Sequence, residues 1–163
     1  MGDFLRQVFI ENGIGLPIAG GMLALMFGGW GSARGLRVAG AQTAGVLAQK
    51  PEMFGKCFAL TVLPATQGIY GFVCMILIAV RAGVIGKAET LPDPAQGIML
   101  FSLGLTAGVV FYFSARFQGE TCAACINLIA RRPEQLGKSL LFPIMVEFYA
   151  LLAFLGLIML YQG

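Results

Sequence analysis

The sequence lacks histidine altogether and contains little charge of either sign. Only 12% of its 163 residues are Asp, Glu, Lys or Arg, whereas soluble domains average about 25%. Without histidine or a second cysteine pair, Cys122 and Cys125 have no companion ligands for a metal centre, and their C-x-x-C spacing alone is weak. We therefore interpret all four cysteines, including Cys57 and Cys74, as small side chains packed in apolar segments.

Long uncharged runs take the place of the missing charge. The chain is 58% hydrophobic and has a mean hydropathy of +0.82. Each run approaches or exceeds the roughly 20 residues that cross a bilayer core, and helices or closed barrels alone satisfy the backbone there. The runs are continuous rather than alternating, which predicts an all-α membrane protein with four transmembrane helices, at about residues 12–48, 53–81, 95–130 and 136–161.

The chain repeats itself at one constant offset, which predicts two helical hairpins, residues 1–82 and 83–163. Each hairpin consists of a helix, a basic turn with proline, and a second helix. The matching segments are Gln49-Lys50-Pro51-Glu52 with Arg131-Arg132-Pro133-Glu134, Gly55-Lys56 with Gly137-Lys138, and Ser32-Ala33-Arg34 with Ser114-Ala115-Arg116.

The two turns are basic, whereas the opposite side mixes acids and bases. By the positive-inside bias, the turns face the cytoplasm, and both termini and the 81–94 loop face outward. Met1–Ile14 contains Asp3 and Glu11 and does not resemble a signal peptide. We expect a multi-pass protein of a bacterial plasma membrane. The basic residues at the turns are Lys50, Lys56, Arg131, Arg132 and Lys138.

Small residues recur in the first helix of each hairpin. Gly31 and Gly35 form one G-x-x-x-G, and Gly104 and Gly108 form another. Such spacing lets membrane helices approach closely. The pattern fits packing within one four-helix unit, or an inner ring built from the first and third helices of many copies.

Glu147 is the only charged residue between Ser139 and Gly163. An acid in hydrocarbon costs roughly 2.5 kcal/mol or more and marks a functional site by default. Glu147 and Gln118 are nearly equally far from the second turn proline, and Thr66 and Gln67 are at matching distances from the first. At about 1.5 Å per residue, all four lie roughly 21–24 Å from their turns and share one depth. Their oxygens suit a hard monovalent cation better than a soft metal.

Two neighbouring residues extend this candidate site. Pro64 cannot donate to the carbonyl of Leu60, so it loosens the helix near Leu63 and could turn a carbonyl toward a cation. An ordinary proline kink is the alternative. Tyr70 lies one turn beyond Thr66 and could donate to Glu147, or form an interhelix hydrogen bond with no ion involved.

Over nearly its whole length the chain resembles the proteolipid subunit of V-type rotary ATPase membrane rotors, in their sodium-transporting bacterial branch. The resemblance rests on the doubled hairpin, the two proline turns, residues 63–72, Gln118 and residues 146–149. It implies that Na+ is held by the Leu63 carbonyl and by side-chain oxygens, and that Tyr70 bonds to the glutamate. The side-chain ligands implied in this way are Thr66, Gln67, Gln118 and Glu147.

The resemblance also implies the assembly and its partners. Many copies would form a homo-oligomeric ring in lipid, facing a membrane stator subunit that presents an arginine. Central-stalk subunits would connect the ring to a soluble ATPase head. The chain has no G-x-x-x-x-G-K-[ST] loop, so we expect it to be a non-catalytic subunit that handles no nucleotide.

Three alternatives remain open from the sequence. The same rotor could carry H+, for which a carboxylate and one partner suffice, or Li+. A small four-helix proton-coupled exporter would have its glutamate in the first helix. A purely structural membrane protein would gain nothing from Glu147. No basic face interleaved with aromatic residues indicates nucleic acid, and we expect Arg34 and Arg116 to face the hole of the ring.

Overall fold

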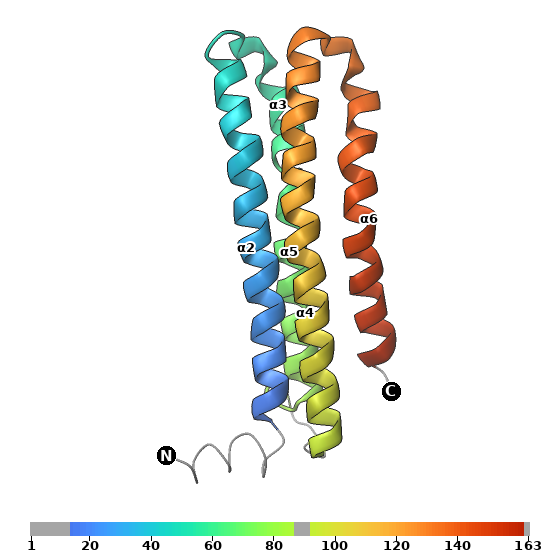
Figure 1. Cartoon of the computed structure of the whole chain (residues 1–163). Coiled ribbons are helices and arrows are strands. Elements are labelled where there is room, and N and C mark those ends of the chain that lie inside the picture. Colours follow the sequence, from blue (N-terminus) through green and yellow to red (C-terminus); the bar gives the residue numbers. More distant parts are fainter. Residues whose placement is uncertain (1–13, 87–91, 162–163) are drawn as a thin grey trace.

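The structure is a computed structural model that describes residues 14–86 and 92–161. It is a bundle of long, nearly parallel helices (Figure 1). The helices are α2 (Gly15–Leu47), α3 (Phe54–Thr61), α4 (Thr66–Arg81), α5 (Pro94–Arg131) and α6 (Leu136–Tyr161), with 3-10 segments η2 (Pro51–Met53), η3 (Leu63–Ala65) and η4 (Pro133–Gln135).

Four segments are long and apolar enough to cross a membrane: Gly15–Leu47, Pro51–Arg81, Pro94–Arg131 and Pro133–Tyr161. This confirms the predicted all-α fold with four transmembrane helices. Residues 12 and 13 of the first predicted helix lie outside the described residues. So do both termini, which we expected to face outward, and residues 87–91 of the outer loop.

The two basic turns adopt the same backbone conformation. Lys50 has φ −138° and ψ 72°, and Arg132 has φ −135° and ψ 79°. Each precedes a proline, whose ring pushes the preceding residue out of the helical region. A 3-10 turn begins at Pro51 and at Pro133 and leads into the next helix. The repeated sequence therefore produces a repeated structure.

The second span is not the continuous helix that residues 53–81 predicted. It breaks into α3 and α4, joined by the 3-10 segment η3 around Pro64. Pro64 has no N–H for the Leu60 carbonyl, and the next N–H, of Ala65, bonds instead to the Val62 carbonyl at 3.1 Å. The loosened backbone expected at Pro64 is therefore present, and it ends beside Thr66.

Glycines bring α2 and α5 into backbone contact, and the two helices lie side by side in Figure 1. A Cβ added at Gly31 would come within 2.6 Å of the Tyr112 Cα, and one at Gly108 within 3.0 Å of the Ala24 Cα. Another stripe of α2 meets α4, where a Cβ at Gly28 would lie 2.7 Å from the Gln67 carbonyl oxygen. Both G-x-x-x-G pairs thus pack within one chain.

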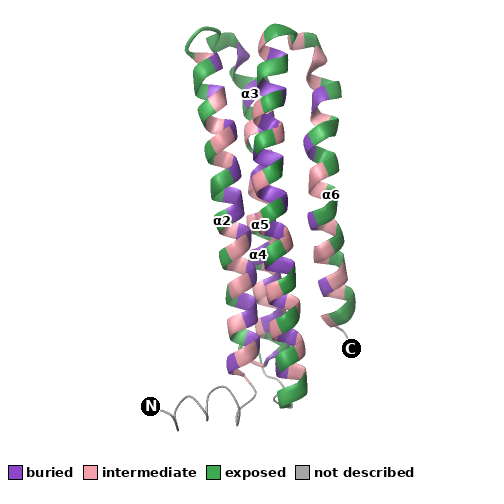
Figure 2. Cartoon of the chain, viewed as in Figure 1, coloured by how far each residue is buried: buried purple, intermediate pink, exposed green. Residues whose placement is uncertain are grey.

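Helix α6 lies at the edge of the bundle and is its most exposed helix (Figure 2). Its buried residues are few and include Pro143 and Ala150. Large apolar side chains cover the rest, for example Met145, Phe148 and Leu152. A helix with so much exposed apolar surface is suited to contact with lipid.

Candidate ion-binding site

Glu147 lies in the middle of α6 and is held by two donors from other helices. The Tyr70 hydroxyl, from α4, donates to Glu147 Oε1 at 2.7 Å. The Gln118 amide, from α5, donates through Nε2 to Glu147 Oε2 at 3.3 Å. The carboxylate is half-buried. These two bonds therefore give hydrogen-bond partners to an acid whose own helix is otherwise apolar.

Behind the carboxylate, two fully buried amides are joined to each other. Gln67 and Gln118 are both 0% exposed, and Gln67 Nε2 donates to Gln118 Oε1 at 2.8 Å. Gln118 Nε2 also donates to the Pro143 carbonyl of α6 at 3.0 Å. Buried amides are costly unless they are bonded, so this pairing connects α4, α5 and α6 at one depth.

The helix break contributes the remaining oxygens. Thr66 is the first residue of α4, and its Oγ1 donates to the Leu63 carbonyl at 3.1 Å. The same hydroxyl lies 3.3 Å from Gln67 Oε1. Because Pro64 interrupts the helix at this point, the Leu63 carbonyl lies next to the Thr66 hydroxyl.

All the residues predicted from the sequence to form the site therefore belong to one connected network or adjoin it. The interhelix hydrogen bond weighed for Tyr70 is present. Coordination of an ion by these residues stays a prediction. The members of the network come from η3 (Leu63, with Pro64 buried beside it), α4 (Thr66, Gln67 and Tyr70), α5 (Gln118) and α6 (Glu147).

Sequence reasoning missed two contributors to this network. Ser114 Oγ lies 3.4 Å from Gln67 Nε2 and donates to the Val146 carbonyl at 3.2 Å. The Pro143 carbonyl accepts from Gln118. The sequence repeat could have pointed to Ser114, because Ser32 occupies the equivalent position in the first hairpin. Ser32 also connects two helices, since its hydroxyl accepts a hydrogen bond from Gly68 N at 2.8 Å.

The other polar and reactive groups lie elsewhere. All four cysteines are free and buried, in keeping with their interpretation as packing residues, and the described residues contain no cluster of His, Cys, Asp or Glu that could hold a metal. Arg34 donates to the Tyr112 hydroxyl at 3.3 Å, and Arg116 pairs with Glu120 at 3.3 Å.

Comparison with known proteins finds the same duplication. The family of the C subunit of ATP synthase matches the chain twice, over residues 19–78 and 101–160, and the two matched ranges begin at equivalent positions of the repeat. The V-type sodium ATPase subunit K of Enterococcus hirae is 37% identical over 131 residues, which cover 80% of each chain. The A-type ATP synthase subunit K of Methanocaldococcus jannaschii is 34% identical over 148 residues, covering 91% of this chain and 62% of that protein.

Proposed function

Because the chain belongs to the ATP synthase C-subunit family, we propose that it is part of the membrane rotor ring of a V-type rotary ATPase and carries Na+ on Glu147. The observation that carries the proposal is the network of uncharged oxygen-bearing side chains around a single carboxylate. The name of the Enterococcus relative, a sodium ATPase subunit, supports the choice of ion.

The composition of the network favours Na+ over H+. A proton site needs only the carboxylate and one partner, such as Tyr70. Here two buried amides and a threonine hydroxyl lie next to the carboxylate as well. Oxygen donors with a single negative charge match a hard monovalent cation, and Li+ belongs to the same class.

Loading requires the buried amides to rearrange. Gln118 directs its NH2 group toward Glu147, and an N–H cannot coordinate a cation. When Na+ enters, the Gln118 amide must rotate to present Oε1, which breaks its hydrogen bonds with Gln67 and with the Pro143 carbonyl. The Leu63 carbonyl and the Thr66 hydroxyl, already adjacent, then complete the set with Gln67 and Glu147.

The same network explains how such a site could move through lipid. A bare carboxylate at an apolar surface pays a large desolvation cost, which a bound Na+ removes. An arginine of the stator would attract the emptied Glu147, and exchange of ions there would let the ring turn. Central-stalk subunits would transmit the rotation to a soluble head that performs the ATP chemistry, with the basic turns on the cytoplasmic side of the plasma membrane.

The test compares Glu147→Gln with Glu134→Gln, which removes an exposed carboxylate at the turn. We expect both variants to assemble, and Glu147→Gln alone to abolish Na+ transport in reconstituted vesicles. A carbodiimide should modify Glu147 in the wild type, and Na+ should slow this reaction at fixed pH. Normal transport by Glu147→Gln contradicts the proposal, and labelling that responds to pH but not to Na+ assigns H+ to the ring.

A further inference from the structure

The buried NH2 group of Gln67 would lose its closest partner when the ion site is loaded. Gln67 is 0% exposed, and its Nε2 donates to Gln118 Oε1 at 2.8 Å. Across the described part of the chain, every buried side-chain nitrogen and oxygen has a hydrogen-bond partner. The proposed loading turns Gln118 Oε1 toward the ion and withdraws this acceptor. The NH2 group of Gln118, which would then face Gln67, cannot accept a hydrogen bond.

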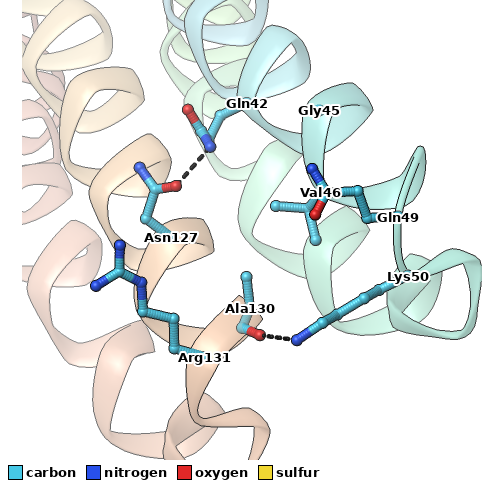
Figure 3. A pocket seen from close by; sticks show the side chains of 8 residues that line it. All are labelled: Gln42, Gly45, Val46, Gln49, Lys50, Asn127, Ala130 and Arg131. Carbon is cyan, nitrogen blue, oxygen red and sulfur yellow. Dashed lines mark hydrogen bonds between the residues drawn. The ribbon is translucent and has the colours of Figure 1, made fainter.

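Water cannot replace the lost acceptor as it could nearer the turns. There a second amide pair, Gln42 with Asn127, joins α2 and α5 beside a cavity of about 420 Å³ that Lys50 and Arg131 also line (Figure 3). A polar cavity of this size has room for water, so an amide there can exchange its partner for solvent. Gln67 is fully buried, and a buried donor without a partner is costly. Loading therefore needs a second acceptor inside the protein.

Ser114 of α5 is in position to be that acceptor. Its Oγ lies 3.4 Å from Gln67 Nε2, and the residue is only 6% exposed. The two heavy atoms of an N–H···O bond are usually about 2.7–3.2 Å apart. The NH2 group of Gln67 can therefore move a few tenths of an ångström closer to Ser114 once Gln118 releases it.

The Ser114 hydroxyl directs its hydrogen away from Gln67. It donates to the Val146 carbonyl of α6 at 3.2 Å. Ser102, an exposed serine of the same helix, instead donates to the Ile98 carbonyl four residues earlier, as hydroxyls within helices commonly do. A serine oxygen has one hydrogen and two lone pairs. The bond to Val146 thus leaves the lone pairs of Ser114 free to accept from Gln67.

The space beside Ser114 offers no substitute for its hydroxyl. A cavity of about 310 Å³ between α5 and α6 is lined by Ser114, by the exposed Tyr149 and otherwise by apolar side chains. Apolar cavities stay dry, so water would not replace the oxygen of Ser114 if it were removed. The same cavity has room for one added methyl group, which makes Ser114→Thr a usable conservative variant.

We propose that Ser114 is a positioning residue of the Na+ site, whose hydroxyl accepts from Gln67 Nε2 when Gln118 turns toward the ion. The inference rests on the proposed function. Ser114 does not contact the ion in this account, but it anchors the nitrogen end of the Gln67 amide. The oxygen end, already 3.3 Å from the Thr66 hydroxyl, is then kept beside a second proposed ligand.

The first experiment measures the Na+ concentration that half-protects Glu147 from carbodiimide in assembled rings. Ser114→Ala should raise it about tenfold, because a buried donor loses its acceptor only in the loaded site. Ser114→Thr keeps the hydroxyl and should restore the wild-type value, and Ser102→Ala should leave it unchanged. Without Na+, the pH dependence of labelling should be the same in all these proteins, because Gln67 then retains its bond to Gln118.

The second experiment asks whether Ser114 acts through Gln67 or only through the Val146 carbonyl. Gln67→Met has a side chain of similar length without an N–H, and its rings should need more Na+ for protection. In that background Ser114→Ala should raise the required Na+ no further, since a double-mutant cycle isolates the effect of one group on the other. If Ser114→Ala rings do not assemble, Ser114→Cys takes their place, because its sulfur is a weak acceptor.

Three results overturn the inference. The first is equal Na+ protection in the wild type and in rings without the Ser114 hydroxyl. The second is a change in the pH dependence of labelling without Na+ that matches the loss of protection. The third is an equal loss from Ser114→Ala with and without the Gln67 amide. Wild-type labelling that does not respond to Na+ is a separate result, which overturns the proposed ion together with this inference.

Discussion

At the scale of single residues, the hydroxyl of Tyr70 is the shortest contact of the Glu147 carboxylate. A hydrogen bond to a charged group contributes about 1.5–3 kcal/mol. Since about 1.4 kcal/mol is tenfold in Kd, Tyr70→Phe should raise the Na+ concentration that half-protects Glu147 from carbodiimide by about tenfold or more. Tyr149→Phe, at an exposed position of α6, should change it little. If Na+ protects Glu147 equally well in Tyr70→Phe and in the wild type, Tyr70 does not contribute to ion binding.

The residue scale also marks how far the sequence could predict the site. Helical rise is constant, so counting from the turns brought Glu147 and Gln118 to one depth, and their amide-to-carboxylate contact exists. Counting gives no rotation about the helix axis. The sequence therefore did not predict that Ser114, one helical turn from Gln118, and the Pro143 carbonyl belong to the network. The orientation of the Gln118 amide depends on neighbours on three helices.

At the scale of elements, the break between α3 and α4 determines where the Leu63 carbonyl lies. The sequence predicted the disturbance from Pro64, but not its extent, because the 3-10 segment that replaces the helix depends on the bond from Ala65 to Val62. Packing also contributes: a Cβ at Gly35 of α2 would lie 2.7 Å from the Pro64 Cβ. The break is therefore fixed by the neighbouring helix as well as by the proline.

Pro64→Ala tests whether the break serves ion binding. The new N–H can bond to the Leu60 carbonyl and make the span continuous, so we expect Na+ to protect Glu147 less well in assembled rings. Pro17→Ala is the control, because the first-turn N–H groups of a helix have no intrahelical partner. Unchanged Na+ protection in Pro64→Ala would show that ion binding does not depend on the proline.

The contact between α2 and α5 makes a second prediction at this scale. A Cβ at Gly35 would meet both the Ala115 backbone and Pro64, whereas one at Gly40 of the same helix meets nothing within 4 Å. Gly35→Ala should therefore lower the thermal stability of the ring in detergent, and Gly40→Ala should not. Equal losses would mean that the tightest contacts of α2 lie between copies rather than within one.

At the scale of the whole molecule, the two hairpins have the same fold but contribute different residues to one site. In the alignment of the two repeats, Glu147 corresponds to Ala65, and Gln118 and Tyr70 correspond to Leu36 and Leu152. The first hairpin thus lacks counterparts of Glu147 and Gln118, and the second lacks a counterpart of Tyr70. The repeated turn sequence predicted the common fold. Aligning the two repeats also shows that apolar residues stand at the positions equivalent to Glu147, Gln118 and Tyr70.

Ala65→Glu would restore an acid without its partners. We expect carbodiimide to label both Glu147 and the new carboxylate, and Na+ to protect Glu147 alone, as read by mass spectrometry of the two peptides. Ala65→Gln controls for side-chain size. Protection at both positions would show that a membrane carboxylate suffices for Na+ and that the amides of Gln67 and Gln118 do not select it.

The single membrane carboxylate per pair of hairpins determines how many ions the ring carries in each revolution. Moving one elementary charge across 100 mV costs about 2.3 kcal/mol. A ring with half as many membrane carboxylates as hairpins divides the free energy of each revolution among fewer ions. More free energy is therefore available to move each ion. Such a ring moves fewer ions per revolution but has more free energy available for each ion. It can therefore still export ions against a membrane potential at which a ring with an acid in every hairpin would stop.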